Sequence, residues 1–378
     1  VFIEDEVMKK RVLLAGSSEV SIYNFRKELV ERLLDEGFEV IVSSPYGSKF
    51  DELIAKGCIF EDTPMNRRSK DVFKDVSLFV TYLKLLRKYK PDLIITYTIK
   101  PNLYACLAAM LMRIPYIMNI TGLGTEIERD GLTGHVLLDA LKPLMRKSDC
   151  VLFQNIVHIN LFKRKGLIKD NYKLVAGSGV NLKEHRQMDY PNGDETEFLY
   201  VGRLMPEKGI AELIEATKIA QKENKNIRVT ALGFCEKAYK EHFEQYNKDN
   251  TIKHMEYTAD VDSAIKGCSA VINASYHEGM SNALLEGAAC GRPLLASDIP
   301  GCREIVDDGK NGFLFKSKDA ADIAEKMLAF SRLSYEERCA MGSESRKKVE
   351  KEFDRDDVVN EIMQEIYRIL NLDPADKK

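Results

Sequence analysis

Two glutamates eight residues apart stand in the segment YHEGMSNALLEGAACGRP, residues 276–293. Glu278 precedes an expected helix, and Glu286 lies inside the run of small and apolar residues that would form it. A capping box would place Glu286 three residues after the N-cap, which would then be Ala283, a poor cap. Capping therefore does not explain this carboxylate. We expect its side chain to point toward the same region as Glu278, and the alternative is a solvated glutamate.

The helix that contains Glu286 starts near two good N-cap residues, Ser281 and Asn282. The backbone amides of Met280 to Ala283 would be free at this helix start, where the helix dipole favours an anion. If one carboxylate accepted hydrogen bonds from a ribose diol, the other accepted them from sugar hydroxyls, and the amides bound a diphosphate, the segment would bind a nucleotide sugar. A plain capped helix is the alternative that these residues leave open.

Two cations follow an expected strand in the segment VGRLMPEKG, residues 201–209. Gly202 permits close approach of the backbone, Arg203 lies at the strand end, and Lys208 lies at the start of the next helix. Arginine offers a bidentate fork and lysine a point charge, which together suit a diphosphate. The alternative is a pair of surface cations, with Lys208 bound to Glu212 one turn later.

The first half of the chain carries weaker signals. Lys100, in TYTIKPNLYA (96–105), lies at the carboxyl end of an expected strand. Gly122 and Gly124 follow another strand, but Ile127 occupies the third glycine position of a dinucleotide fingerprint, so that interpretation is weak.

No local pattern predicts a metal site or an enzymatic nucleophile. Asp260 and Asp262 are more typical of acidic residues at a helix start than of a metal motif. The histidines and cysteines have no metal-ligand spacing, and neither a P-loop nor a G-x-S-x-G motif occurs. The eight scattered cysteines are typical of reduced core thiols. We therefore expect no metal and no cofactor.

The composition is that of an ordinary globular protein, with 44% hydrophobic and 30% charged residues in 378. The net charge of -3 gives no general reason to expect nucleic-acid binding. No apolar stretch reaches the ~20 residues that span a bilayer, and the N-terminus lacks a secretory signal, so we expect a cytoplasmic protein. Basic residues 65–70 and 83–90 are typical of solvated faces, and the alternative is peripheral contact with an anionic membrane surface.

Short apolar runs alternate with amphipathic helices, which predicts α/β domains whose parallel sheets are covered on both faces. We predict an N-terminal Rossmann-like domain over residues 1–180, a linker over 181–194 and a C-terminal Rossmann-like domain over 195–353. A final helix over 355–370 could pack on either domain, and we place it on the first. Two doubly wound domains facing across a cleft would bind ligands at the carboxyl ends of their strands.

The order of the motifs resembles that of a known family. VGRLMPEKG, then EGMSNALLE, then GRPLLASDIPGCREIVDDGKNGFLF, is similar to the retaining family 4 glycosyltransferases of GT-B fold. TYTIKPNLYACLAA and PYIMNITGLGTEIE resemble the branch that builds capsule, O-antigen and lipid-linked oligosaccharides in bacteria. The resemblance implies a hexosyltransferase that moves a hexose or N-acetylhexosamine from a UDP-sugar to a polyprenyl-diphosphate-linked saccharide.

The resemblance also implies a role for each motif residue. Arg203 and Lys208 would clamp the donor diphosphate and stabilise the leaving group, and Glu278 would act with them at the donor sugar. Glu286 would bind the ribose. The other implied donor-binding residues are Gly16, Ser17, Gly202, Met280, Ser281 and Asn282, and the implied acceptor-side residues are Lys100, Asn119 and Gly122.

This chain departs from the family in two places. AGSSEVS stands where many relatives have a glycine-rich loop, which puts the approach of Gly16, Ser17 and Ser18 to the phosphates in doubt. Tyr97 and residues 119–121 stand where histidines are common, so no catalytic histidine is assigned. In the front-face mechanism that the family implies, the leaving phosphate helps to deprotonate the acceptor hydroxyl, and a metal would be redundant.

Three alternatives stay open. A GT-B-fold UDP-sugar epimerase would need further carboxylates and histidines near the nucleotide, and the six histidines form no cluster in the sequence. A glycosyltransferase with a soluble acceptor and a non-catalytic protein that binds nucleotide sugars are the other two.

Overall fold

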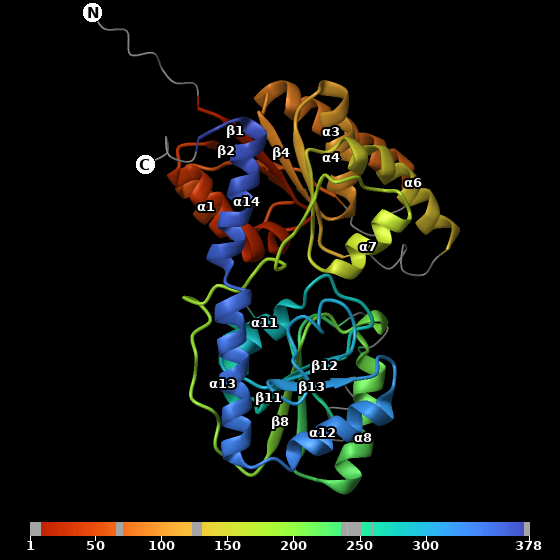
Figure 1. The fold of residues 1–378 in the computed structure, drawn as a ribbon, viewed down its shortest axis with the longest axis vertical. Coiled ribbons are helices and arrows are strands. Elements are labelled where there is room, and N and C mark those ends of the chain that lie inside the picture. Colours follow the sequence, from red (N-terminus) through yellow and green to blue (C-terminus); the bar gives the residue numbers. More distant parts are fainter. Residues whose placement is uncertain are drawn as a thin grey trace, which may run out of the picture. The chain divides into compact units, whose positions relative to one another are not determined.

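We describe a computed structural model of the chain, covering residues 9–65, 71–122, 131–235, 240, 251–258 and 260–373. The chain forms two compact units (Figure 1). One comprises residues 1–178 and 356–378, and the other comprises residues 179–355.

The first unit is built on a seven-stranded parallel sheet in the order β3-β2-β1-β4-β5-β6-β7. The strands are β1 (Arg11–Ala15), β2 (Glu39–Ser44), β3 (Ile59–Asp62), β4 (Leu93–Tyr97), β5 (Tyr116–Ile120), β6 (Cys150–Phe153) and β7 (Tyr172–Leu174). The order reverses between β1 and β4, which pair directly. Ligands of such sheets bind outside the carboxyl ends of the strands at this reversal.

Helices cover both faces of this sheet because successive strand residues point to opposite sides. Leu13, Ile94 and Met118 face a core shared with α3 (Val72–Tyr89), α4 (Ile99–Met112), α6 (Leu132–Lys147) and α7 (Ile156–Arg164). Val12 and Ile95 face the opposite core, shared with α1 (Phe25–Asp35), α2 (Phe50–Ala55) and α14 (Arg355–Leu370).

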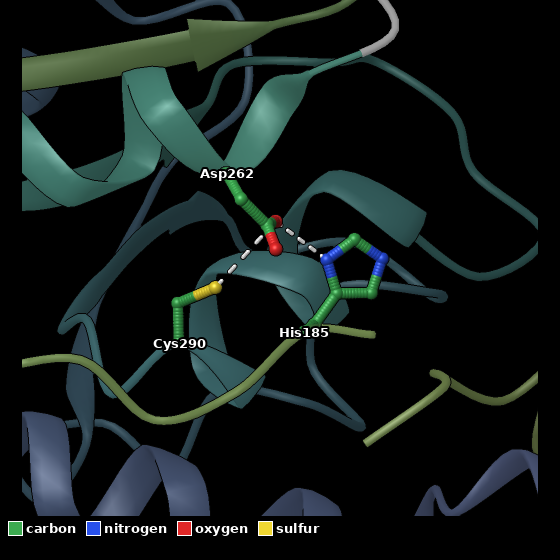
Figure 2. A group of neighbouring side chains, drawn as sticks. All are labelled: His185, Asp262 and Cys290. Carbon is green, nitrogen blue, oxygen red and sulfur yellow. Dashed lines mark hydrogen bonds and ion pairs between the residues drawn. The ribbon is translucent and has the colours of Figure 1, made fainter. Parts of the chain in front are cut away.

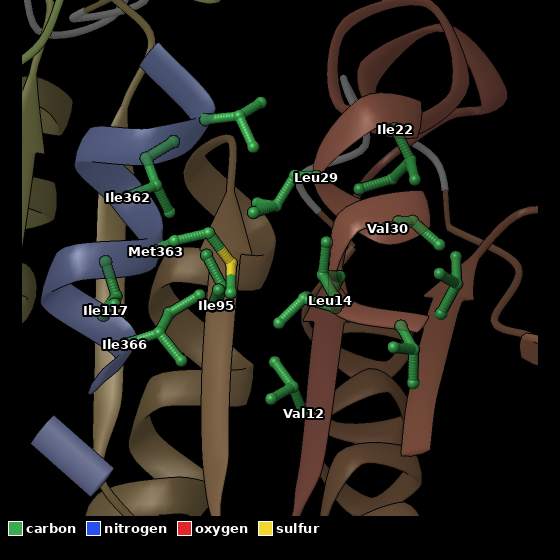
Figure 3. Packing of buried hydrophobic residues seen from close by; sticks show 14 of the residues in the cluster. Val12, Leu14, Ile22, Leu29, Val30, Ile95, Ile117, Ile362, Met363 and Ile366 are labelled. Carbon is green, nitrogen blue, oxygen red and sulfur yellow. The ribbon is translucent and has the colours of Figure 1, made fainter. Parts of the chain in front are cut away.

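The last helix, α14, returns to the first unit. Ile362, Met363 and Ile366 lie against the strands and α1 in Figure 3, and each is almost fully buried. A buried side chain of this size contributes about 1.5–3 kcal/mol. The Tyr367 hydroxyl donates a hydrogen bond to Glu36 and fixes the helix end.

The second unit has a six-stranded parallel sheet in the order β10-β9-β8-β11-β12-β13. The strands are β8 (Thr196–Val201), β9 (Ile227–Leu232), β10 (Lys253–Met255), β11 (Ala270–Asn273), β12 (Leu294–Ser297) and β13 (Gly312–Phe315). One core joins the sheet to α8 (Ile210–Glu223) and α12 (Ala320–Ser331). The described residues of this unit also form the α-helices α10 (Val261–Gly267), α11 (Asn282–Ala289) and α13 (Tyr335–Glu352). The strand order reverses between β8 and β11.

Residues 181–194, which we expected to form a linker, lie within the second unit. The fully buried Arg292 guanidinium donates hydrogen bonds to the Met188 and Asp189 carbonyls at 3.3 and 2.9 Å. The Tyr190 hydroxyl donates to the Ser269 carbonyl at 2.8 Å. These contacts, rather than a helix or a strand, hold the segment against the second unit.

No disulfide joins any of the eight cysteines, and six are buried, in agreement with the expected core thiols. Among the helices of the described ranges, none is long and apolar enough to cross a bilayer.

Candidate active site

Arg203 lies where β8 ends, at the strand reversal of the second sheet. The Gly202 amide continues the ladder to the Leu232 carbonyl at 2.9 Å. The buried Tyr200 hydroxyl donates to the Arg203 carbonyl at 2.9 Å and holds the backbone there. The Arg203 side chain is exposed. The backbone of Arg203 is therefore fixed, while its exposed guanidinium is accessible to an anion.

Lys208 ends a 3-10 turn, Pro206–Lys208, and forms an ion pair across the strand reversal. Its Nζ lies 2.6 Å from Glu278 Oε1, although the two residues are 70 positions apart. Glu212, the local alternative for Lys208, instead accepts a hydrogen bond from the Tyr276 hydroxyl at 2.6 Å. The interpretation of Lys208 as a cation paired one turn along its own helix is therefore wrong.

The carboxylate of Glu278 is positioned by groups from β11 and the residues that follow it. The Ser275 hydroxyl donates to Oε1 at 2.8 Å, and the Asn273 side-chain amide lies 3.4 Å from the same oxygen. Glu278 and Lys208 keep 15% and 24% of their side chains exposed. Arg203, Lys208 and Glu278 thus follow the two neighbouring strands at the reversal, where a doubly wound sheet binds its ligand.

The start of α11 is capped as the sequence predicts, but its amides are not all free. Ser281 is the N-cap, and its hydroxyl accepts hydrogen bonds from the Leu284 amide and, at 2.7 Å, from the Asn273 side chain. The Ser281 amide donates to the Gly301 carbonyl at 2.9 Å. The prediction of a free amide at Ser281 is therefore wrong. The carbonyl that accepts its hydrogen bond belongs to Gly301, in a loop outside residues 276–293. Met280, also predicted to bind the donor, is almost fully buried.

Glu286 and Asn282 lie on the half-buried side of α11, and Leu284 and Leu285 on its fully buried side. Burial raises the pKa of the Glu286 carboxyl, while the positive charges of His185 and Arg355 oppose this rise. A carboxylate that is partly removed from water and has no capping role needs another reason to be present. Binding of ribose hydroxyls would supply one.

Next to Glu286, the structure brings together His185, Asp262 and Cys290 (Figure 2). The His185 Nδ1 lies 2.6 Å from Asp262 Oδ1, and the Cys290 Sγ lies 3.7 Å from the same oxygen. Sequence reasoning missed this group because its members come from three distant segments. The one local signal was the four-residue spacing of Glu286 and Cys290, which places them on one helix face. Asp262 lies, as expected, in the first turn of a helix, α10, capped by Asp260.

In the first unit, Gly16 and Ser17 lie directly after β1, at the reversal of that sheet. The Gly16 amide donates to the Ser43 carbonyl at 2.9 Å. A side chain at Gly16 would lie 2.5 Å from Ile22, so only glycine fits without rearrangement. The Ser17 hydroxyl is buried and has no hydrogen-bond partner among the described residues. A polar ligand bound at this position could accept a hydrogen bond from the Ser17 hydroxyl.

Lys100 follows β4, the strand next to β1. Its Nζ pairs with Asp75 Oδ1 of α3 at 2.5 Å, and only 14% of its side chain is exposed. Just before it, Thr98 has a φ of 73°, which is unusual for a β-branched residue. Such strained positions concentrate at functional sites.

Asn119 and Gly122 occupy different environments. The Asn119 side chain is fully buried in β5, and neither of its polar atoms has a partner within the described part of the chain. In this structure it offers no exposed atom to an acceptor. Gly122 has a φ of 149°, and Gly124 of the predicted turn lies outside the described residues. Basic residues 66–70 also lie outside them.

Two family models match the chain, one in each unit. The family described as Glycosyl transferases group 1 matches residues 182–348, and the family described as Glycosyl transferase 4-like matches residues 11–155.

Similar proteins of known sequence are glycosyltransferases. The chain is 26% identical over 338 residues to the Campylobacter jejuni N,N'-diacetylbacillosaminyl-diphospho-undecaprenol alpha-1,3-N-acetylgalactosaminyltransferase, covering 84% of this chain and 88% of that protein. It is also 26% identical to the Staphylococcus aureus capsular polysaccharide biosynthesis glycosyltransferase CapM, covering 76% of this chain and 79% of that protein.

Solved structures share the fold. Anabaena HepE in complex with UDP and glucose has a TM-score of 0.78 at 16% identity, covering 95% of this chain and 100% of that one. A Rickettsia africae glycosyltransferase has a TM-score of 0.78 at 16% identity, covering 96% and 99%. The chain therefore belongs to the glycosyltransferases of GT-B fold, with a glycosyltransferase 4-like first unit and a second unit of the glycosyl transferases group 1 family.

Proposed function

We propose that the protein is a retaining hexosyltransferase that moves a hexose or N-acetylhexosamine from a UDP-sugar to a polyprenyl-diphosphate-linked saccharide. The observation that carries the proposal is the grouping of Arg203, Lys208 and Glu278 at the strand reversal of the second unit. The name of the Campylobacter relative includes a diphospho-undecaprenol acceptor, which supports the acceptor class. The UDP complexes of HepE support the donor class.

The proposed chemistry is electrostatic. As the glycosidic bond to UDP breaks, negative charge develops on the leaving diphosphate, and the cations Arg203 and Lys208 stabilise it. In the proposed front-face mechanism, a leaving phosphate oxygen accepts the proton of the acceptor hydroxyl. Glu278, held by Ser275 and Lys208, accepts hydrogen bonds from the donor sugar. No metal is needed for these roles.

The second unit also offers a platform for the nucleotide base. Phe234 follows β9 and Tyr257 follows β10, and their rings stack with centroids 4.9 Å apart and an interplanar angle of 12°. Both rings are exposed. Exposed aromatic faces at the carboxyl edge of the sheet suit a planar base.

The function is tested by incubating the protein with a panel of UDP-sugars and polyprenyl-diphosphate saccharides. We expect a product whose mass increases by one hexose or N-acetylhexosamine and whose new bond keeps the anomeric configuration of the donor. An inverted product would contradict the retaining mechanism. Conversion of the UDP-sugar without an acceptor would favour the epimerase alternative, and transfer only to water-soluble saccharides would favour the soluble-acceptor alternative.

Replacing Glu286 with glutamine should weaken donor binding through the ribose. A hydrogen bond to a charged group contributes about 1.5–3 kcal/mol, so we expect KM for the UDP-sugar to rise roughly 10- to 100-fold. The variant should also discriminate less between the UDP-sugar and its 2'-deoxyuridine analogue. Glu215→Gln, an exposed change on α8, is the matched control. Equal discrimination by E286Q and the wild type would remove Glu286 from the ribose site.

A lipid-linked acceptor fits a stripe of exposed residues on α3. Phe73, Val76 and Val80 are 89%, 55% and 39% exposed, and their spacing places them on one helix face. Lys84 continues the same face and is exposed. Apolar side chains beside a lysine suit the boundary of an anionic membrane.

We expect Phe73→Ser to reduce co-sedimentation of the protein with vesicles of phosphatidylglycerol and phosphatidylcholine. Ile54→Ser changes a similarly exposed apolar residue on α2, which packs on the other face of the sheet, and serves as the control. The peripheral contact would be contradicted by equal sedimentation of both variants and the wild type.

A further inference from the structure

We propose that His185, Asp262 and Cys290 form a binding site for one divalent transition-metal ion of the Zn²⁺ class. Their ligand atoms are the imidazole Nδ1, a carboxylate oxygen and the thiol sulfur, and all lie within 4.8 Å of one another. Figure 2 shows the three side chains converging from separate segments. None of them belongs to the group of Arg203, Lys208 and Glu278, so the inference does not depend on the proposed transferase mechanism.

The geometry is close to that of a three-ligand tetrahedral site. Bonds of about 2.0–2.3 Å to nitrogen, oxygen and sulfur place the ligand atoms roughly 3.3–3.8 Å apart around the metal. The Cys290 Sγ to Asp262 Oδ1 distance of 3.7 Å already falls in this range. The His185 Nδ1 to Asp262 Oδ1 distance of 2.6 Å is that of a hydrogen bond, and a small side-chain rotation would open it.

The type of ligand atoms selects the metal. Thiolate and imidazole favour Zn²⁺ and related ions, whereas Mg²⁺ and Ca²⁺ prefer an all-oxygen set. In this structure, the imidazole and the thiol both donate to the same oxygen of Asp262. A metal ion would take the place of the protons on His185 Nδ1 and Cys290 Sγ, which would be released to solvent. Cys290 would then bind the ion as a thiolate and His185 through Nδ1.

The side chains also leave a path for the ion. His185 and Asp262 keep 18% and 25% of their side chains exposed, while Cys290 is fully buried behind them. Water can occupy a fourth position on the exposed side. Glu286 lies one turn before Cys290 on the same helix and interacts electrostatically with His185 and Cys290, so its negative charge adds to the attraction for a cation.

The backbone around each ligand is fixed before any ion binds. The His185 amide donates to the Asn181 carbonyl at 2.9 Å, and Arg346 donates to the His185 carbonyl at 2.9 Å. Asp262 lies in a capped helix turn. The Cys290 amide donates to the Glu286 carbonyl at 3.0 Å. Ligands held on anchored elements lose little conformational freedom on binding, which favours affinity.

The test is a Co²⁺ titration of the whole 378-residue chain after chelator treatment. We expect one Co²⁺ per chain, with a thiolate-to-cobalt charge-transfer absorption that added Zn²⁺ removes. Cys290→Ser should abolish this absorption, and His185→Gln or Asp262→Asn should weaken binding by at least about 10-fold. Cys339→Ser changes a half-exposed thiol outside the group and should bind like the wild type.

A second measurement covers the case in which Cys290→Ser fails to fold. Zn²⁺ should raise the Tm of the wild type by mass action and raise the Tm of His185→Gln by clearly less at the same Zn²⁺ concentration. The proposal is overturned if the wild type gives no charge-transfer absorption, if C290S keeps it, or if Zn²⁺ raises the Tm of wild type and H185Q equally.

Discussion

Replacing Lys208 with alanine is expected to lower kcat by about 100- to 1,000-fold, which is the typical loss when one group that stabilises developing charge is removed. Lys208 Nζ lies 2.6 Å from Glu278, on the neighbouring strand connection, so the ammonium is already held at the strand reversal before a donor binds. Arg203→Ala should have an effect of similar size, because its exposed guanidinium follows the adjacent strand end. Steady-state transfer of labelled sugar measures both.

The matched control is Lys222→Ala. Lys222 is exposed in the last turn of α8, the helix that begins just after Lys208, so its removal changes the net charge equally. We expect K222A to keep wild-type turnover. Equal turnover by K208A and K222A would remove Lys208 from the reaction.

A double-mutant cycle separates catalysis from the ion pair itself. If Lys208 served only to neutralise Glu278, the K208A and E278A changes would be strongly non-additive, and the double variant would be no worse than either single one. If each residue contacts a different part of the donor, the double variant should be clearly less active than both. We expect the second result, since the proposed partners are the diphosphate for Lys208 and the sugar for Glu278.

The sequence predicts the α/β class well because the relevant signal is local. Runs such as RVLLAG and DLIITYT are apolar throughout, as strands covered on both faces must be, and they become β1 and β4. Residue types alone also narrow the N-cap of α11 to Ser281 or Asn282, and the structure has Ser281. These features depend on neighbours within one turn or one strand.

The rest of the site depends on contacts between distant segments. For Lys208 the sequence offered Glu212, four residues away, as a plausible partner. The pairing of β8 with β11, which the sequence does not show, brings Glu278 to Lys208 instead. The carbonyl that occupies the Ser281 amide belongs to Gly301, in a loop after another strand. His185 lay in a segment expected to be a linker, so nothing in the local pattern connected it with Asp262.

Gly209→Ala is expected to destabilise the second unit by about 2–5 kcal/mol, combining overpacking with left-handed backbone strain. Gly209 has a φ of 66°, and a β-carbon there would lie 1.9 Å from the Ala274 carbonyl oxygen. Because that oxygen belongs to the backbone between β11 and Glu278, it cannot move away as a flexible side chain would. Scanning calorimetry should show a lower Tm for the second unit.

Gly309→Ala provides the control for backbone strain alone. Gly309 has a φ of 75°, in the same unit, and a β-carbon there would meet nothing within 4 Å. We expect a loss of only about 1–2 kcal/mol. At about 2–4 °C per kcal/mol for a domain of this size, the two variants should be separable by Tm. Equal destabilisation would mean that the close approach to Ala274 has no energetic effect.

The two glycine variants should differ in activity as well as in stability. Gly209 immediately follows Lys208, and Ala274 lies four residues before Glu278, so the crowded contact joins the two backbone segments that carry the ion pair. Pushing these segments apart would lengthen the 2.6 Å contact and misplace both groups relative to the donor. We therefore expect G209A, assayed below its Tm, to lose turnover while G309A keeps it. Gly209 would then control the placement of Lys208 and Glu278, because a residue without a β-carbon lets the two backbone segments approach closely enough for the ion pair to form.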